Sequence, residues 1–192
     1  PSIISVANSP EPPLEHREPT KVIVNATDNV AVTRITIQWP GMTAADMTYN
    51  STTGFWTYMI PGQDAGTSFN VTIKAYDEAG NYKTAAFPKW WIDKTPPVIL
   101  TVNQTSDAPL LGENVMITAH VADNAGVKYI TITYDGIARN LTLSNGTSIN
   151  GYWTYLIQGP TTETTITFTI TAYDGYNNAT YGPHSKHWST PE

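Results

Sequence analysis

Residues 27–39 read TDNVAVTRITIQW, and residues 122–134 read ADNAGVKYITITY. Both stretches begin with a polar turn around Asp-Asn and continue as a run in which apolar and polar residues alternate. Alternation with a period of two is typical of a strand that buries one face and leaves the other in water. The two stretches therefore predict an antiparallel β-fold that occurs twice in the chain.

Further matches extend this repeat over nearly the whole chain. They pair 1–6 (PSIISV) with 97–102 (PVILTV), 54–60 (GFWTYMI) with 151–157 (GYWTYLI), and 71–77 (VTIKAYD) with 168–174 (FTITAYD). Matches in the same order and register indicate two copies of one domain. We predict domains at residues 1–94 and 95–192, joined by the stretch 91–99 (WIDKTPPVI), whose two prolines favour a stiff, extended chain.

Each repeat divides into about seven short strands and has no helical periodicity. We expect strands near 2–7, 20–27, 32–39, 43–49, 54–60, 68–77 and 82–91, and again near 97–103, 114–122, 127–134, 137–143, 150–157, 164–174 and 179–188. Two facing antiparallel sheets are the simplest way to bury these apolar stripes. The predicted fold class is all-β, with two tandem seven-stranded antiparallel β-sandwiches.

Composition excludes several classes of function. The 192 residues carry a formal net charge of −6 and only 10 Lys and Arg, so nucleic-acid binding is not expected. The chain has no Cys, which excludes disulfides and Cys-ligated zinc. No apolar run reaches the roughly 18–20 residues of a membrane span, so we expect no membrane insertion of this segment, which starts without Met and reads as part of a longer precursor. We also expect no enzymatic activity, because no catalytic triad pattern, phosphate loop or HExxH motif is present.

Two motifs carry a resemblance to a known class of module. The turn D-N-x-x-V precedes the third strand of each repeat, and A-Y-D-x-x-x-N follows the sixth. Together with the Cys-free repeat, they resemble the immunoglobulin-like modules of bacterial and archaeal cell-surface proteins, which are relatives of fibronectin type III and cadherin modules. Residues 93–99 (DKTPPVI) resemble the joint between such modules in tandem arrays.

The resemblance implies an extracellular or cell-surface protein. It favours a non-catalytic stalk, spacer or adhesion element of a larger repeat protein, whose partners are neighbouring modules of the same chain. Two alternatives stay open: a carbohydrate- or protein-binding appendage of a secreted enzyme, and a subunit of a surface lattice (an S-layer) or a filament. Surface glycans or proteins are the further partners that these readings imply.

Acidic residues at one end of the second domain predict a calcium site. Asp123 and Asp174 end the second and sixth strands, and the loops after these strands should meet near Asp93 of the joint. Ca²⁺ takes about 6–8 oxygen ligands, and clustered carboxylates repel one another without a cation. We therefore predict Ca²⁺ at Asp93, Asp123 and Asp174, with Glu18 of the first domain facing them, an outline similar to cadherin calcium sites. The alternative is that these aspartates only cap turns.

Seven of the 14 asparagines begin an Asn-x-Ser/Thr sequon: Asn25, Asn50, Asn70, Asn103, Asn140, Asn145 and Asn178. Because Ser and Thr make up about a fifth of the chain, chance alone predicts roughly three such matches. The excess favours a secreted, N-glycosylated protein. The alternative is that Thr-rich strands generate sequons without a function.

Two aromatic residues interrupt the repeat. Most tryptophans recur at equivalent positions, which favours a place in the core. Trp90 and Tyr82, however, align with His187 and Ala179. If they are exposed, Trp90 and Tyr82 are candidates for stacking against a sugar ring.

Overall fold

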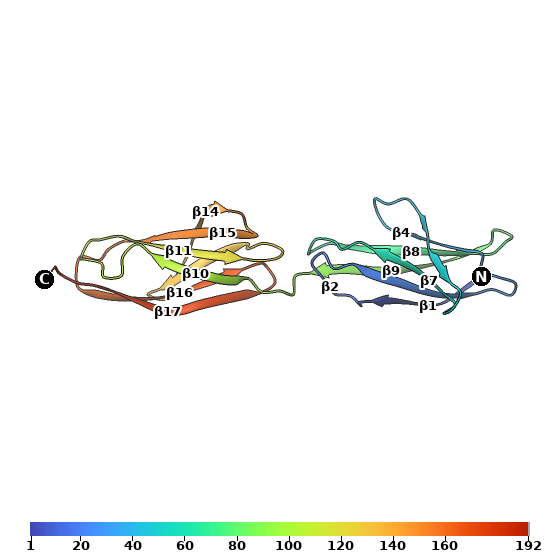
Figure 1. Ribbon diagram of the computed structural model, residues 1–192, viewed down its shortest axis with the longest axis horizontal. Helices are drawn as coiled ribbons and strands as arrows, with labels where there is room; N and C mark the ends of the chain where they lie inside the picture. The colour runs from blue at the N-terminus through green and yellow to red at the C-terminus, as the bar shows by residue number, and fades with distance from the viewer. Residues whose placement is uncertain (192) are drawn as a thin grey trace. The chain divides into compact units, whose positions relative to one another are not determined.

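The computed structural model describes residues 1–191 (Figure 1). The chain separates into two compact units, Pro1–Ile92 and Asp93–Glu192. This division lies two residues before the predicted boundary after Lys94, and it places Asp93 in the second unit. Among the described residues, no helix is long and apolar enough to cross a bilayer.

The first unit consists of two sheets. Its strands are β1 (Ser2–Ser9), β2 (Leu14–Glu15), β3 (Thr20–Thr27), β4 (Arg34–Gln38), β5 (Ala45–Asp46), β6 (Thr48–Asn50), β7 (Phe55–Ile60), β8 (Ser68–Tyr76) and β9 (Tyr82–Ile92). One sheet has the order β1-β3-β7-β6 and the other β2-β9-β8-β4-β5. Neighbouring strands are antiparallel, except that the short β2 runs parallel to β9.

The second unit repeats this plan. Its strands are β10 (Val98–Gln104), β11 (Val115–Ala122), β12 (Tyr129–Tyr134), β13 (Ile137–Asn140), β14 (Thr142–Gly146), β15 (Asn150–Ile157), β16 (Thr164–Tyr173) and β17 (Asn178–Trp188). The sheets have the orders β10-β11-β15-β14 and β13-β12-β16-β17. Where the first unit has β2, the second has a single parallel bridge between Leu110 and Ser189.

The all-β fold of two tandem sandwiches is confirmed, and the described residues form nine strands in the first unit and eight in the second where seven were expected in each. The predicted strand 43–49 is two strands in different sheets, because β5 pairs with β4 whereas β6 pairs with β7. The predicted strand 137–143 divides in the same way into β13 and β14. Met47 and Leu141 lie between the two halves and are buried, so each chain segment crosses from one sheet to the other over one apolar side chain.

The cores follow the alternation in the sequence. Along β11 the inward residues are fully buried and the residues between them are partly exposed. The same pattern holds in β8 and β16. Each unit has its own cluster of buried apolar side chains, so each has the hydrophobic core of an independent domain.

A tryptophan is the largest fully buried side chain of each core. Trp91 lies in the core of the first unit, and Trp188 lies in the core of the second. Each indole N–H donates a hydrogen bond of 2.8 Å to a backbone carbonyl, that of Glu18 for Trp91 and that of Glu113 for Trp188. The two units therefore satisfy their largest core side chain in the same way.

Candidate metal site

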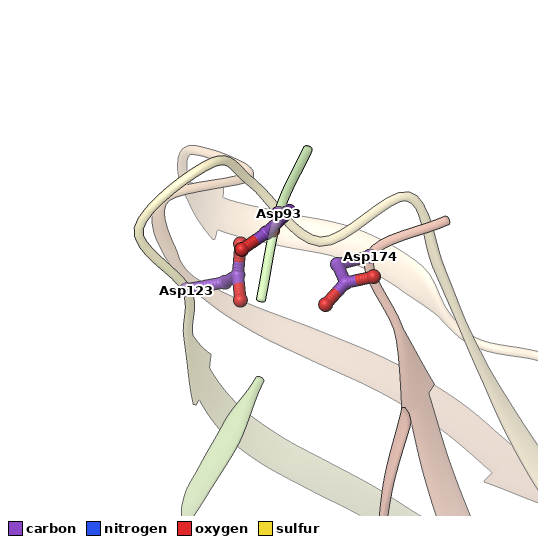
Figure 2. Close-up of side chains that lie close together, drawn as sticks. All are labelled: Asp93, Asp123 and Asp174. Carbon is purple, nitrogen blue, oxygen red and sulfur yellow. The ribbon is translucent and has the colours of Figure 1, made fainter. Parts of the chain in front are cut away.

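Three carboxylates meet at one end of the second unit. Asp123 directly follows β11, Asp174 directly follows β16, and Asp93 precedes β10. One carboxylate oxygen of each lies within 4.8 Å of those of the other two. Figure 2 shows the side chains of Asp93 and Asp123 directed toward each other, with Asp174 beside them. The structure thus brings together the three residues of the second unit that the sequence predicts as ligands.

Each carboxylate also holds its own turn. Asp123 accepts the backbone N–H groups of Ala125 and Gly126 through Oδ1, at 2.9 and 2.6 Å. Asp93 accepts the N–H of Thr95 through Oδ1 at 3.1 Å. These are the short Asx-type contacts that an aspartate after a strand commonly makes. Turn capping and ligand binding are therefore compatible, because a carboxylate has two oxygens.

Asn177 connects two of the three aspartates. Its backbone N–H donates to Asp174 Oδ1 at 2.6 Å, and its side-chain Nδ2 donates to Asp174 Oδ2 at 3.1 Å. The same Nδ2 donates to the backbone carbonyl of Asp93 at 3.0 Å. The sequence analysis missed this residue. The signal was the asparagine after A-Y-D in both repeats, since Asn81 donates to Asp77 in the same two ways.

Asp123 provides the strongest indication of a missing ligand. Its side chain is buried, with 7% of the residue exposed, and its Oδ2 has no hydrogen-bond partner among the described residues. An ionised oxygen that is buried without a partner is costly. Asp123 belongs to the cluster, where a cation would supply the missing interaction.

The donor set selects the kind of cation. All three side chains offer oxygen, and no nitrogen or sulfur ligand belongs to the cluster. Hard oxygen donors suit Ca²⁺ or Mg²⁺ rather than zinc or copper. Three carboxylates leave room for carbonyl or water ligands around a Ca²⁺ ion, which takes about 6–8 oxygens.

The equivalent end of the first unit carries two carboxylates, Asp28 and Asp77. Asp28 accepts the backbone N–H of Val30 through Oδ1 at 3.0 Å. The pKa of Asp77 is lowered mainly by the side-chain hydrogen bond from Asn81 and is raised slightly by the charge of Asp28. This end of the first unit therefore carries two carboxylates where the second unit has three.

Glu18, the predicted ligand from the first unit, lies outside the unit that holds the three aspartates, and its part in the site stays a prediction. It belongs to the first unit, where its carboxylate accepts the backbone N–H of Glu15 at 2.8 Å. Its backbone carbonyl accepts the indole N–H of Trp91. The contacts of Glu18 are those of a loop that closes over the core.

Trp90 and Tyr82 are both exposed, by 38% and 59%. Both lie on β9, which pairs with β8 without a register shift, and they are eight residues apart. At about 3.4 Å per residue this separates them by roughly 27 Å, too far to hold one sugar ring. Tyr82 packs on Tyr76 with ring centroids 5.6 Å apart, and Trp90 lies beside a shallow hollow next to Asn70. The two aromatics thus form no common platform.

Six of the seven sequon asparagines are exposed, and Asn25 is partly buried. The amide oxygen of Asn50 accepts the N–H groups of Thr52 and Thr53, which leaves its nitrogen available. Exposure is a requirement for N-glycosylation. The glycosylation of these residues stays a prediction.

Comparison with known proteins gives one family and several similar proteins. The family described as "Domain of unknown function (DUF7743)" matches residues 91–187, which is 97 of the 192 residues. Chitinase A1 of Niallia circulans is 30% identical over 166 residues. The match covers 80% of this chain but 21% of that enzyme, so the chain spans about a fifth of the length of this curated relative.

A titin domain pair among the solved structures supports the fold. The titin domains Z1Z2 in complex with telethonin have a TM-score of 0.50 and 13% identity, covering 93% of this chain and 90% of that one. The amphioxus IgVJ-C2 molecule has a TM-score of 0.47 and 13% identity, covering 91% of this chain and 98% of that one. The titin pair confirms that the two units are tandem immunoglobulin-like β-sandwiches.

Proposed function

The chain belongs to the family described as a domain of unknown function (DUF7743), and on this premise we propose that it is a non-catalytic, calcium-binding spacer of a larger secreted or cell-surface protein. In this proposal the two sandwiches set reach and orientation. A Ca²⁺ ion at Asp93, Asp123 and Asp174 stabilises the end of the second sandwich. The observation that carries the calcium part is Asp123, which belongs to the cluster of three carboxylates and whose buried Oδ2 has no hydrogen-bond partner among the described residues.

The position of Asp93 explains how an ion would affect a spacer. Asp93 stands before Pro96 and Pro97 in the stretch that leads into β10. The other two ligands belong to the loops after β11 and β16. A shared ion would therefore fasten the start of the second unit to two of its loops, and the prolines would limit the remaining freedom of that stretch.

Calcium binding can be measured directly on the full chain. After removal of metals with EDTA, we expect isothermal titration with CaCl₂ to show one site per chain. A free Ca²⁺ concentration one hundredfold above the dissociation constant stabilises the folded state by about 2.7 kcal/mol. Mg²⁺ serves as the comparison ion, because its smaller octahedral shell suits this cluster less well.

Matched variants separate ligand binding from turn formation. Asp123→Asn keeps an amide oxygen to accept the N–H groups of Ala125 and Gly126 but removes the charge, so it should abolish calcium binding while the turn persists. Asp28→Asn makes the same change in the first unit and should leave calcium binding intact. Wild-type protein that binds no Ca²⁺ at millimolar concentration would contradict the proposal, as would full binding by Asp123→Asn.

The match to chitinase A1 favours a second candidate, in which the chain is a polysaccharide-binding appendage of a secreted hydrolase. Co-sedimentation with insoluble chitin, and with cellulose as the control polymer, tests this candidate. Retention on chitin that depends on Trp90 or Tyr82 would favour the appendage. Equal recovery in the supernatant with both polymers would leave the spacer as the supported function.

A further inference from the structure

Two tyrosines and a sequon asparagine form a row across the second unit. Tyr129 of β12 is the Cα partner of Tyr173 of β16, and Tyr173 is the partner of Asn178 of β17. Their neighbours Ile130 and Ala172 are buried, so the row lies on the outer face of the sheet. The two tyrosine rings stack with centroids 4.5 Å apart and an interplanar angle of 19°.

A third tyrosine completes a hollow around this row. Tyr176, two residues before Asn178, is 50% exposed, and Tyr129 is 43% exposed. The hollow has a volume of about 250 Å³ and is lined by the three tyrosines together with Lys128, Asn177 and Asn178. It offers apolar ring faces with amide and ammonium groups at the rim, the combination that suits a pyranose ring with its apolar face and its hydroxyl edge.

The first unit fills the corresponding position with a ring of its own. There Tyr82 is the Cα partner of Tyr76, and the two rings pack with centroids 5.6 Å apart. In the second unit Asn178 stands opposite Tyr173, because the turn before β17 is one residue shorter and a register shift between Phe168 and Ile170 restores the pairing. Asn178 thus replaces a packed ring and also begins the sequon Asn178-Ala179-Thr180.

We infer that Asn178 carries an N-linked sugar whose first pyranose packs on Tyr176 and on the Tyr129–Tyr173 pair. In the transfer, Asn178 Nδ2 forms a bond to the anomeric carbon of a lipid-linked oligosaccharide. The anomeric phosphate leaves with the lipid, and Nδ2 gives up one proton. The inference rests on the proposed extracellular placement, since the chain must meet this donor, and it is independent of calcium.

The other sequons differ in the residue two positions before the asparagine, which is aromatic in none of the other six. Asn50 and Asn145 do have an aromatic cross-strand partner, and Asn70 lines a hollow with Trp90. Asn103 lies on β10 with Thr118 as its cross-strand partner and is the matched control. A sugar on Asn103 should extend into solvent, whereas a sugar on Asn178 should be ordered against protein.

The test uses the full chain secreted from a host that N-glycosylates proteins. Peptide mapping should find sugar on Asn178. Removing that sugar by Asn178→Gln should lower the Tm of the wild-type protein by about 4 °C. The same substitution made in the Tyr176→Ala variant should lower Tm by clearly less. In NMR spectra of the glycoprotein, protons of the first sugar on Asn178 should show upfield ring-current shifts that Tyr176→Ala reduces. The sugar on Asn103 should show neither effect.

Three outcomes would overturn the inference: no sugar on Asn178, sugar shifts equal to those of a free glycan, or the same Tm loss with and without Tyr176. A separate titration of the Asn178→Gln protein with free N-acetylglucosamine distinguishes the source of the sugar. Binding there at low millimolar concentration or better would indicate a site for foreign glycans and would also overturn the inference. If the proposed extracellular placement is wrong, the result is different: the protein isolated from its natural source carries no sugar on any sequon.

Discussion

The two units use the same turns at the same end of the sandwich but provide them with different charges. In both, an aspartate after β3 or its counterpart β11 and an aspartate after A-Y accept backbone N–H groups. In the first unit, Asp28 and Asp77 are the two carboxylates at this end. In the second, Asp123 meets the carboxylate of Asp93.

This difference separates what the fold needs from what a ligand needs. Turn capping requires one carboxylate oxygen, and both units have it. A metal site requires several oxygens that converge, and in the described residues only the second unit has three. The third carboxylate turns a structural feature of both units into a binding feature of one.

The largest effect should be the same in both units, because it depends on the shared core. Trp91→Ala and Trp188→Ala each remove a fully buried indole and leave a carbonyl without its donor. We expect each to lower the free energy of unfolding of its own unit by about 3–5 kcal/mol. Urea denaturation followed by NMR signals from each unit measures both losses. If one substitution lowers the free energy of unfolding by less than half as much as the other, the two cores are not equivalent.

A transplanted carboxylate should remove the difference between the acidic ends. Asp93 stands four residues before Pro97, and Pro97 aligns with Pro1. Adding Asp-Lys-Thr-Pro in front of Pro1 should therefore bring a third carboxylate to Asp28 and Asp77. We expect the calcium stoichiometry to rise from one to two. At one hundredfold excess of Ca²⁺ over the dissociation constant, the first unit should gain about 2.7 kcal/mol and at least 10 °C in Tm. The same extension with Asn in place of Asp is the control and should bind one ion.

Alkaline pH should distinguish the units at one edge of the core. Trp39 packs edge-on against Tyr58, and at the equivalent position Tyr134 packs edge-on against Tyr155. Burial, followed by the hydrogen bond to Tyr155, raises the pKa of Tyr134 to about 12. Above pH 10 the unfolded chain loses this proton while the folded chain keeps it, so stability should fall between pH 10 and 12. Tyr134→Trp copies the first unit, and calorimetry from pH 9 to 12 should show a smaller decline for the variant.

The smallest effect concerns two buried lysines at equivalent positions. Lys89 donates to the amide oxygen of Asn8, whereas Lys186 donates directly to Asp107 at 3.1 Å. The pKa of Asp107 is lowered first by the hydrogen bond from Gln104 and next by that from Lys186.

Replacing each lysine by Met should show this difference in a carboxylate titration. We expect Lys186→Met to raise the pKa of Asp107 clearly. Lys89→Met should raise that of Glu11 only slightly, because Glu11 depends mainly on hydrogen bonds from Asn8. NMR titration of the carboxylates from pH 2 to 6 measures both, and equal shifts would contradict the prediction. Asp107 stabilises the fold above its unfolded pKa, and this contribution is lost as pH falls through the lowered value.

The sequence predicted the features that depend on local pattern. Alternation placed the strands. Asp123 and Asp174 follow their strands at the same alternation as the buried residues, and the predicted meeting of the two loops near Asp93 gave their convergence. Asp-Asn after a strand is compatible with either a turn or a ligand, and the second carboxylate oxygen explains why the pattern alone cannot separate the two.

The features that the sequence did not predict depend on long-range pairing. Met47 and Leu141 look like ordinary strand residues, and only the neighbouring sheets reveal that the chain changes partner there. Residue-by-residue alignment matched Tyr82 with Ala179, but strand pairing matches it with Asn178. The alignment and the strand pairing differ because of a register shift elsewhere in β17, and no local sequence motif predicts that shift.

The parallel pairing of β2 with β9 has a mechanical consequence. Leu14 and Glu15 of β2 are Cα partners of Trp91 and Ile92 of β9, at opposite ends of the first unit's sequence. Tension applied to the two ends of this unit pulls parallel neighbours in opposite directions, so their hydrogen bonds are loaded together in shear rather than opened one at a time. The second unit has one bridge, Leu110–Ser189, at this place. Under stretching force the second unit should therefore be the first to yield.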